Sequence, residues 1–224
     1  AAIRWIYSDL RFDYSEDSSP ASAFAADLSM YYNNYFDIGN RECQLGLGMN
    51  ISNIGSKITY FGDERSQFLP ANLRIGGRYT NTIDEYNKIN ILLDFNKLLV
   101  PTPPISNGND TYSEYYSNMT DYNNTSTMLG LFQSLYDAPG GFREELQEIQ
   151  VSLGGEYWYN NTFAFRGGYF YEHANKGGRQ YLTLGFGLKY NVFLFDMSYL
   201  VPTTAFGNNP LSNTLRISIS VNFS

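Results

Sequence analysis

The sequence predicts an all-β protein, a transmembrane antiparallel β-barrel with short helices in one long extracellular loop. Three observations predict it: about ten segments in which apolar and polar side chains alternate, turn residues between these segments, and an aromatic content of 17% that equals the charged content. Alternation with a period of two turns one set of side chains toward lipid and the other toward water. Strands of a buried sandwich alternate too, so the prediction depends on the repetition along the chain.

The expected strands follow one another through the whole chain. They cover residues 3–12, 21–36, 41–53, 72–80, 87–99, 149–160, 162–172, 180–190, 192–201 and 214–223. The last one is the clearest, with Leu215, Ile217 and Ile219 on one side and Arg216 and Ser218 on the other.

The connections between these strands alternate strictly between short and long. The short ones are residues 37–40, 81–85, 160–161 and 190–191, and the long ones are 13–20, 54–71, 100–148, 173–179 and 202–213. Outer-membrane barrels have short periplasmic turns and long outer loops, whereas a soluble sandwich has no reason to follow this rule.

Composition agrees with a barrel and excludes one class of partner. The chain has 20 Tyr and 16 Phe, and aromatic rings suit the two interfaces of a membrane. No apolar stretch reaches the roughly 18 to 20 residues of a spanning helix, so strands must do any spanning. A net charge of −7 argues against nucleic acid as a partner.

We expect residues 1–224 to form a single barrel domain that lacks its first strands. Ile3, Trp5 and Tyr7 alternate as if the chain began inside a strand, and no secretory signal precedes them. The lone Cys43 belongs to an alternating apolar run and is expected to face lipid; a free reactive thiol is the alternative.

The predicted inward face is polar and contains many glycines. Its charged members are Arg74, Arg78, Lys88, Asp94, Glu156, Arg166, Lys189, Asp196 and Arg216. We expect opposite charges to pair across neighbouring strands, with a hydrophilic passage or ligand cavity as the alternative. Inward apolar residues favour a filled lumen: Leu92, Trp158, Phe170, Tyr181, Leu194 and Leu200.

The connection over residues 100–148 is the most individual part of the sequence. It predicts helices at 125–136 and 141–147, the first of them amphipathic. This segment is either a lid packed on the barrel mouth or a docking surface, since long ordered loops often carry recognition. The expected partner-binding residues are Met128, Leu129, Leu131, Phe132, Leu135 and Tyr136.

The sequence gives little support for enzyme chemistry, and we expect no catalytic residues, no metal and no cofactor. His173 is the only histidine, and Glu172 beside it points the opposite way on a strand. His173 is expected to be a polar residue at the corner between a strand and a loop.

From residue 163 onward the sequence becomes specific, reading FAFRGGYFYEHANKGGRQYLTLGFGLKYNVFLFDMSYLVP and later LRISISVNF. These segments resemble the PorV family of outer-membrane proteins of the type IX secretion system, part of the FadL-like barrel group. The similarity is strongest over the C-terminal third of the chain and is only a general pattern before residue 148. The resemblance implies a barrel of about fourteen strands, about ten of them present in this chain.

The resemblance also implies a function, a location and partners. Members are non-enzymatic shuttles in the bacterial outer membrane that cross it several times, surrounded by its lipid. They associate with a large translocon barrel, receive secreted cargo proteins through the cargo's C-terminal domains and pass them to a surface attachment complex. The alternative is a FadL-type transporter that moves hydrophobic compounds through its lumen.

Overall fold

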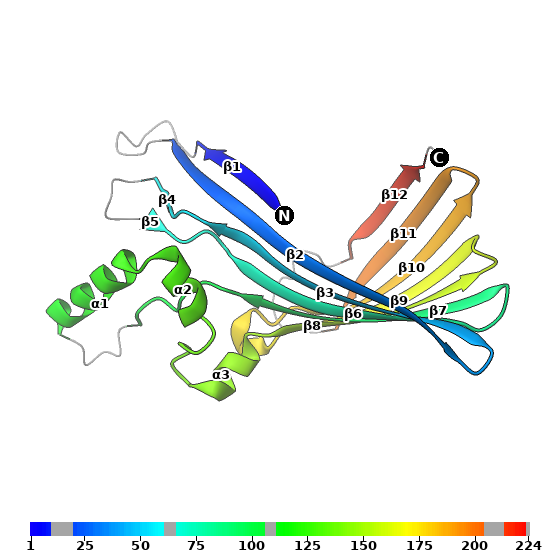
Figure 1. Cartoon of the computed structure of the whole chain (residues 1–224). Helices are drawn as coiled ribbons and strands as arrows, with labels where there is room; N and C mark the ends of the chain where they lie inside the picture. Colours follow the sequence, from blue (N-terminus) through cyan, green and yellow to red (C-terminus); the bar gives the residue numbers. More distant parts are fainter. Residues whose placement is uncertain (10–19, 61–65, 106–110, 204–212, 223–224) are drawn as a thin grey trace. The chain divides into compact units, whose positions relative to one another are not determined.

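The computed structural model describes residues 1–9, 20–60, 66–105, 111–203 and 213–222. Its main element is a ten-stranded sheet, antiparallel wherever the register is described, in the order β1-β2-β3-β6-β7-β8-β9-β10-β11-β12 (Figure 1). A separate two-stranded sheet pairs β4 with β5. This architecture confirms the all-β class, with β1 and β12 at the two ends of the strand order.

All ten predicted strands are present, with ends close to those expected. The strands of the large sheet are β1 Ala2–Ser8, β2 Ala21–Ile38, β3 Arg41–Gly55, β6 Asn72–Thr82, β7 Asn87–Leu98, β8 Gln150–Tyr159, β9 Phe163–Tyr171, β10 Gln180–Tyr190, β11 Phe193–Pro202 and β12 Leu215–Val221. The predicted end of the first strand, residues 10–12, and residue 223 of the last lie outside the described residues. The alternation of short and long connections is confirmed.

The remaining elements lie in the long connections. They are β4 Ile58–Thr59, β5 Ser66–Gln67, α1 Tyr112–Asn124, α2 Thr127–Gln133, α3 Phe142–Gln147 and the 3-10 helix η2 Ala174–Lys176. Helices α2 and α3 confirm the two predicted helical stretches, although α2 ends before Tyr136. Helix α1 and the β4–β5 hairpin are not predicted by the sequence analysis.

Asparagine shapes the short turn between β8 and β9. Asn160 and Asn161 both have positive φ, 52° and 50°. The Thr162 N–H donates to the Tyr159 carbonyl oxygen at 3.0 Å across this turn. A turn of type I′ requires the left-handed conformation at both central positions, and asparagine adopts it more readily than most residues.

The chain divides into two compact units, each built from several segments. The first unit contains residues 1–29, 50–73 and 97–146, and the second contains 30–49, 74–96 and 147–224. Strands β2, β3, β6 and β7 contribute residues to both. The expected single domain over residues 1–224 stays a prediction.

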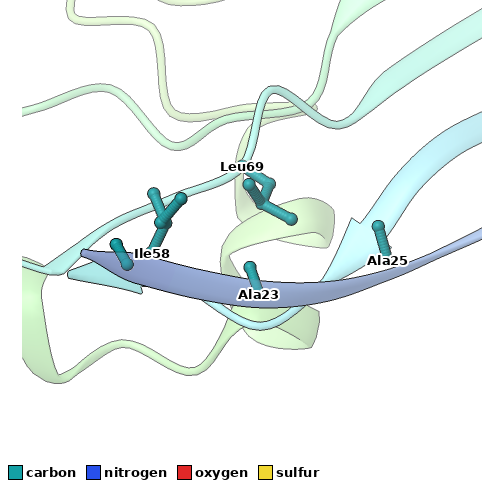
Figure 2. Close-up of a cluster of buried hydrophobic side chains, with 5 residues drawn as sticks. Ala23, Ala25, Ile58 and Leu69 are labelled. Carbon is teal, nitrogen blue, oxygen red and sulfur yellow. The ribbon is translucent and has the colours of Figure 1, made fainter. Parts of the chain in front are cut away.

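The core of the first unit lies where a loop folds onto strand β2. Ala21, Ala23 and Ala25 are buried there against Ile58 and Leu69, which come from the connection between β3 and β6 (Figure 2). Small side chains on β2 let the loop backbone approach, and Ser56 donates its N–H to the Phe24 carbonyl oxygen at 2.9 Å. The loop therefore covers one face of this part of β2.

In the second unit the two faces of the sheet differ as predicted. Phe165, Leu184 and Ile217 are exposed on one face, where Ile217 keeps 60% of its surface accessible. Their neighbours Arg166 and Gly185 belong to the opposite face because side chains alternate along a strand. Leu215 and Ile219 are exposed as well, so this apolar stripe is not part of a protein interior.

Cys43 departs from its expected environment. It shares a face of β3 with the exposed Leu47 and Met49, yet only 2% of its surface is accessible. Its Sγ lies 3.3 Å from the Tyr79 hydroxyl, so the neighbouring strand covers it. Within the described residues no helix is long and apolar enough to cross a membrane.

Candidate partner-binding surface

Helix α2 is fixed to the first unit through two residues in its middle. Gly130 is buried, and a Cβ there would come within 2.9 Å of the Phe68 ring and 3.0 Å of Pro101. Leu131 is 6% exposed and packs in a cluster with Ala71 and Leu99. The helix begins at a Ser126 cap, whose hydroxyl accepts the Leu129 N–H at 3.3 Å.

Helix α3 is anchored by a buried ion pair. The Lys97 ammonium at the end of β7 lies 2.6 Å from Glu145 Oε2, and the two side chains are 10% and 8% exposed. The other carboxylate oxygen of Glu145 accepts the Ala138 N–H at 2.8 Å. One side chain thus joins α3, the turn before it and the sheet.

Helix α1 is capped at its start and is bonded at its end to the connection between β3 and β6. At its start, Thr111 and Glu114 form a capping box in which Glu114 accepts the Thr111 N–H at 2.8 Å. At its end, the Lys57 ammonium donates to the Asn123 carbonyl oxygen at 2.6 Å and lies 4.1 Å from the centre of the Phe68 ring. Burial lowers the pKa of Lys57 below its usual value.

This anchoring leaves an apolar surface exposed. Of the six predicted partner-binding residues, five are exposed, and we call them the α2 surface: Met128, Leu129, Phe132, Leu135 and Tyr136. Phe132 keeps 57% of its surface accessible and Tyr136 70%. Leu131 is the exception because its side chain belongs to the core.

Two further exposed apolar residues lie on α3. Phe142 is 79% exposed and Leu146 52%, and their spacing of four residues puts them on one face of that helix. The sequence analysis missed them, although the same spacing was visible within the predicted helix at 141–147.

Three of the predicted inward charges pair across strands in the second unit. Arg166 of β9 binds Glu156 of β8 with Nε 2.5 Å from Oε2, and its Nη1 also bonds Asp196 of β11. To reach Asp196 the side chain crosses β10 at Gly187, where a Cβ would lie 2.8 Å from both Nη1 and Asp196 Oδ1. Pairing across neighbouring strands is therefore confirmed at this position.

Beside this ion-pair network lies a hollow of about 430 Å³ within the second unit. Leu92, Phe170 and Tyr181 contribute apolar surface, and Glu156 and Arg166 contribute charge. Phe170 and Tyr181 stack with ring centres 4.8 Å apart. The lining therefore combines apolar and charged groups.

His173 lies at the corner after β9. Its Nδ1 accepts the Asn175 N–H at 3.2 Å and caps the 3-10 helix η2. Glu172 accepts two bonds from the Arg179 guanidinium, at 2.7 and 2.8 Å, and one from Gln150 at 2.8 Å. Burial acts to raise the pKa of Glu172, but these bonds hold it below its usual value. Among the described residues, no group of three or more His, Cys, Asp and Glu side chains is arranged to hold a metal ion.

Comparison with known proteins identifies a family match in the N-terminal part of the chain. Residues 1–105 match the family model described as type IX secretion system protein PorV. This match confirms the resemblance to PorV. It lies in the N-terminal strands, where the sequence analysis found only a general pattern, whereas the specific similarity was expected over residues 163–223. The matched residues make up slightly less than half of the chain. No curated protein matches the chain.

Proposed function

We propose that this chain is a non-enzymatic shuttle of the type IX secretion system, which binds secreted cargo at the translocon and passes it to the surface attachment complex. This proposal rests on the PorV match over residues 1–105. In this proposal the sheet crosses the outer membrane, with the exposed apolar stripe of Leu215, Ile217 and Ile219 against lipid.

The observation that carries the binding role is the α2 surface. A loop that served only as a lid would bury its apolar side chains against the sheet. Here Gly130 and Leu131 make the inward contacts, and Leu129 and Phe132 remain exposed. Exposed aromatic and aliphatic side chains on an anchored helix need little reordering on binding, which favours affinity.

The test is a double substitution, Leu129→Asp with Phe132→Asp. Both side chains are exposed, so the fold should survive, whereas two carboxylates buried in an interface should abolish binding. Affinity purification from outer membranes in mild detergent should then lose the large translocon barrel and the secreted proteins. Leu131 is unsuitable for this test because it is buried.

A matched control is Tyr86→Asp, which changes an exposed aromatic residue of the second unit in the turn between β6 and β7. This variant should co-purify with the same proteins as the wild type. If the double variant still brings down translocon and cargo as the wild type does, the α2 surface is not the binding site. If even the wild type brings down neither, the shuttle role is wrong.

The apolar part of the hollow supports a second candidate, a FadL-type transporter of hydrophobic compounds. Leu92, Phe170 and Tyr181 would suit an apolar ligand, but the Glu156 and Arg166 charges in the same lining would not. Filling the hollow with Gly154→Trp, at a position where a Cβ meets only ordinary contacts, should abolish uptake of a hydrophobic compound if transport is the function. It should leave translocon association unchanged if the shuttle role is correct.

A further inference from the structure

Strand β7 has a charged face and an apolar face. Asn90 donates to Glu156 of β8 at 2.7 Å, so the even-numbered residues of β7 belong to the charged face. Ile89 pairs with Tyr157 of β8, and Tyr157 pairs with Phe165 of β9. Paired residues point to the same side of a sheet, so the odd-numbered residues of β7 belong to the face on which Phe165 is exposed.

Helices α2 and α3 pack on this apolar face at the end of β7. The Leu99 N–H donates to the Ala71 carbonyl oxygen at 2.7 Å, which continues the pairing of β6 with β7 beyond the last residue of the strand. Alternation therefore places Lys97 and Leu99 on the apolar face. Leu99 clusters with Leu131 of α2, and Lys97 pairs with Glu145 of α3. Both helices thus lie on the side of β7 that the proposed function turns toward lipid.

The positions that the helices cover fall within the height of a membrane. The ten residues from Ile89 to Leu99 advance about 33 Å, which at a tilt of about 40° spans about 25 Å along the membrane normal. This is the height of the apolar band of an outer-membrane barrel. On the apolar face of β7 the exposed residues end at Phe95, and Lys97 and Leu99 are buried. The outer sides of α2 and α3 therefore complete the band beside these two residues.

The environment of Lys97 supports the same placement. An exposed lysine in water needs no partner, whereas an ammonium on the lipid side of a barrel wall is costly. Here the ammonium lies 2.6 Å from the Glu145 carboxylate, and the two side chains are 10% and 8% exposed. In addition, residues 125–136, which include α2, contain no charged side chain. The only cation of this face near α2 is thus neutralised and covered, as hydrocarbon surroundings require.

We infer that the α2 surface lies against membrane lipid, so that α2 and α3 extend the apolar outer face of the sheet at the border of the bilayer. This rests on the proposed function for the position of the sheet in the outer membrane. It also deepens that function, because a partner that binds the α2 surface must meet it from within the plane of the membrane. Tyr136 suits this border because its ring is apolar and its hydroxyl can reach water.

The experiment places spin labels on introduced cysteines of the full chain, reconstituted in phosphatidylcholine vesicles. Power saturation compares collisions of each label with oxygen, which concentrates in lipid, and with a nickel chelate, which stays in water. Phe132→Cys on α2 and Leu146→Cys on α3 test the inference. Leu184→Cys in β10 is the lipid reference, and Asn40→Cys in the turn between β2 and β3 is the water reference. The unsubstituted chain, labelled in the same way, measures any signal from Cys43.

At Phe132 and Leu146 the ratio of oxygen to nickel collision rates should exceed the ratio at Asn40 and lie closer to that at Leu184. A ratio close to the water reference would overturn the inference and leave the shuttle role intact. Low collision rates with both reagents would also overturn it, because they indicate a label covered by protein. If Leu184 itself reports water, the sheet does not cross the membrane, and the proposed function fails together with the inference.

Discussion

The buried ion pair between Lys97 and Glu145 predicts how firmly the helical segment is attached. We expect Glu145→Ala to loosen α2 and α3, because it leaves the Lys97 ammonium in a buried site without its carboxylate. At 2.6 Å the attraction is about 6 kcal/mol for an effective dielectric of about 20. Much of that offsets desolvation, and breaking such a pair from one side costs about 3 to 5 kcal/mol. A surface pair would contribute less than about 1 kcal/mol.

The assay is amide hydrogen exchange followed by mass spectrometry. A loss of about 3 to 5 kcal/mol raises the undocked population by about two to three and a half powers of ten. Exchange of the α2 and α3 amides should accelerate by up to the same factor, while the amides of β8 to β11 keep their protection. Arg143→Ala, at an exposed position of the same helix, serves as the control and should change neither.

A second variant tests whether the charge itself is responsible. Lys97→Met combined with Glu145→Met removes both charges and fills the site with apolar groups, so most of the protection should return. Wild-type exchange in Glu145→Ala would refute the role of the pair. A double variant as loose as Glu145→Ala would show that packing or the Ala138 hydrogen bond holds the segment.

Two further predictions concern the second unit. Gly187→Ala should lower the free energy of unfolding in detergent by about 1 to 3 kcal/mol, because the added methyl group displaces Arg166 from Asp196; an unchanged urea midpoint would contradict this. Arg179→Met should destabilise the protein at neutral pH and have little effect in acid. The lowered pKa of Glu172 stabilises the native state above the ordinary glutamate pKa and ceases to do so as the pH falls through the native value. Wild type and variant should therefore differ most in thermal stability at neutral pH and converge once Glu172 is protonated in both, and a constant difference across this range would contradict the assignment.

Local pattern was sufficient to predict the strands. Side chains alternate over the full length of β10, and the turn residues Asn160 and Asn161 mark one of its neighbouring hairpins, so both signals lie within a few residues. The hairpin β4–β5 has only two residues per strand, too few for a period to be visible. It exists because Ile58 packs onto β2, a contact that no local pattern contains.

Only the locally determined part of the candidate site could be predicted from the sequence. Amphipathic spacing identified α2, but it could not show that Leu131 alone among the six faces the core, since this depends on Ala71 and Leu99. Helix α1 has no buried residue and therefore no apolar face to detect. Its one usable signal was the Thr111 and Glu114 capping box. The Lys97–Glu145 pair joins positions 48 residues apart, beyond the reach of any local rule.

The environment of Cys43 makes the chain convenient for site-directed labelling. It is the only cysteine, and thiol reagents must reach its sulfur past the Tyr79 side chain. A second cysteine introduced by Phe132→Cys or Tyr136→Cys would be far more accessible. Crosslinkers or spectroscopic probes can therefore be attached to the α2 surface in the native protein without first replacing the natural thiol.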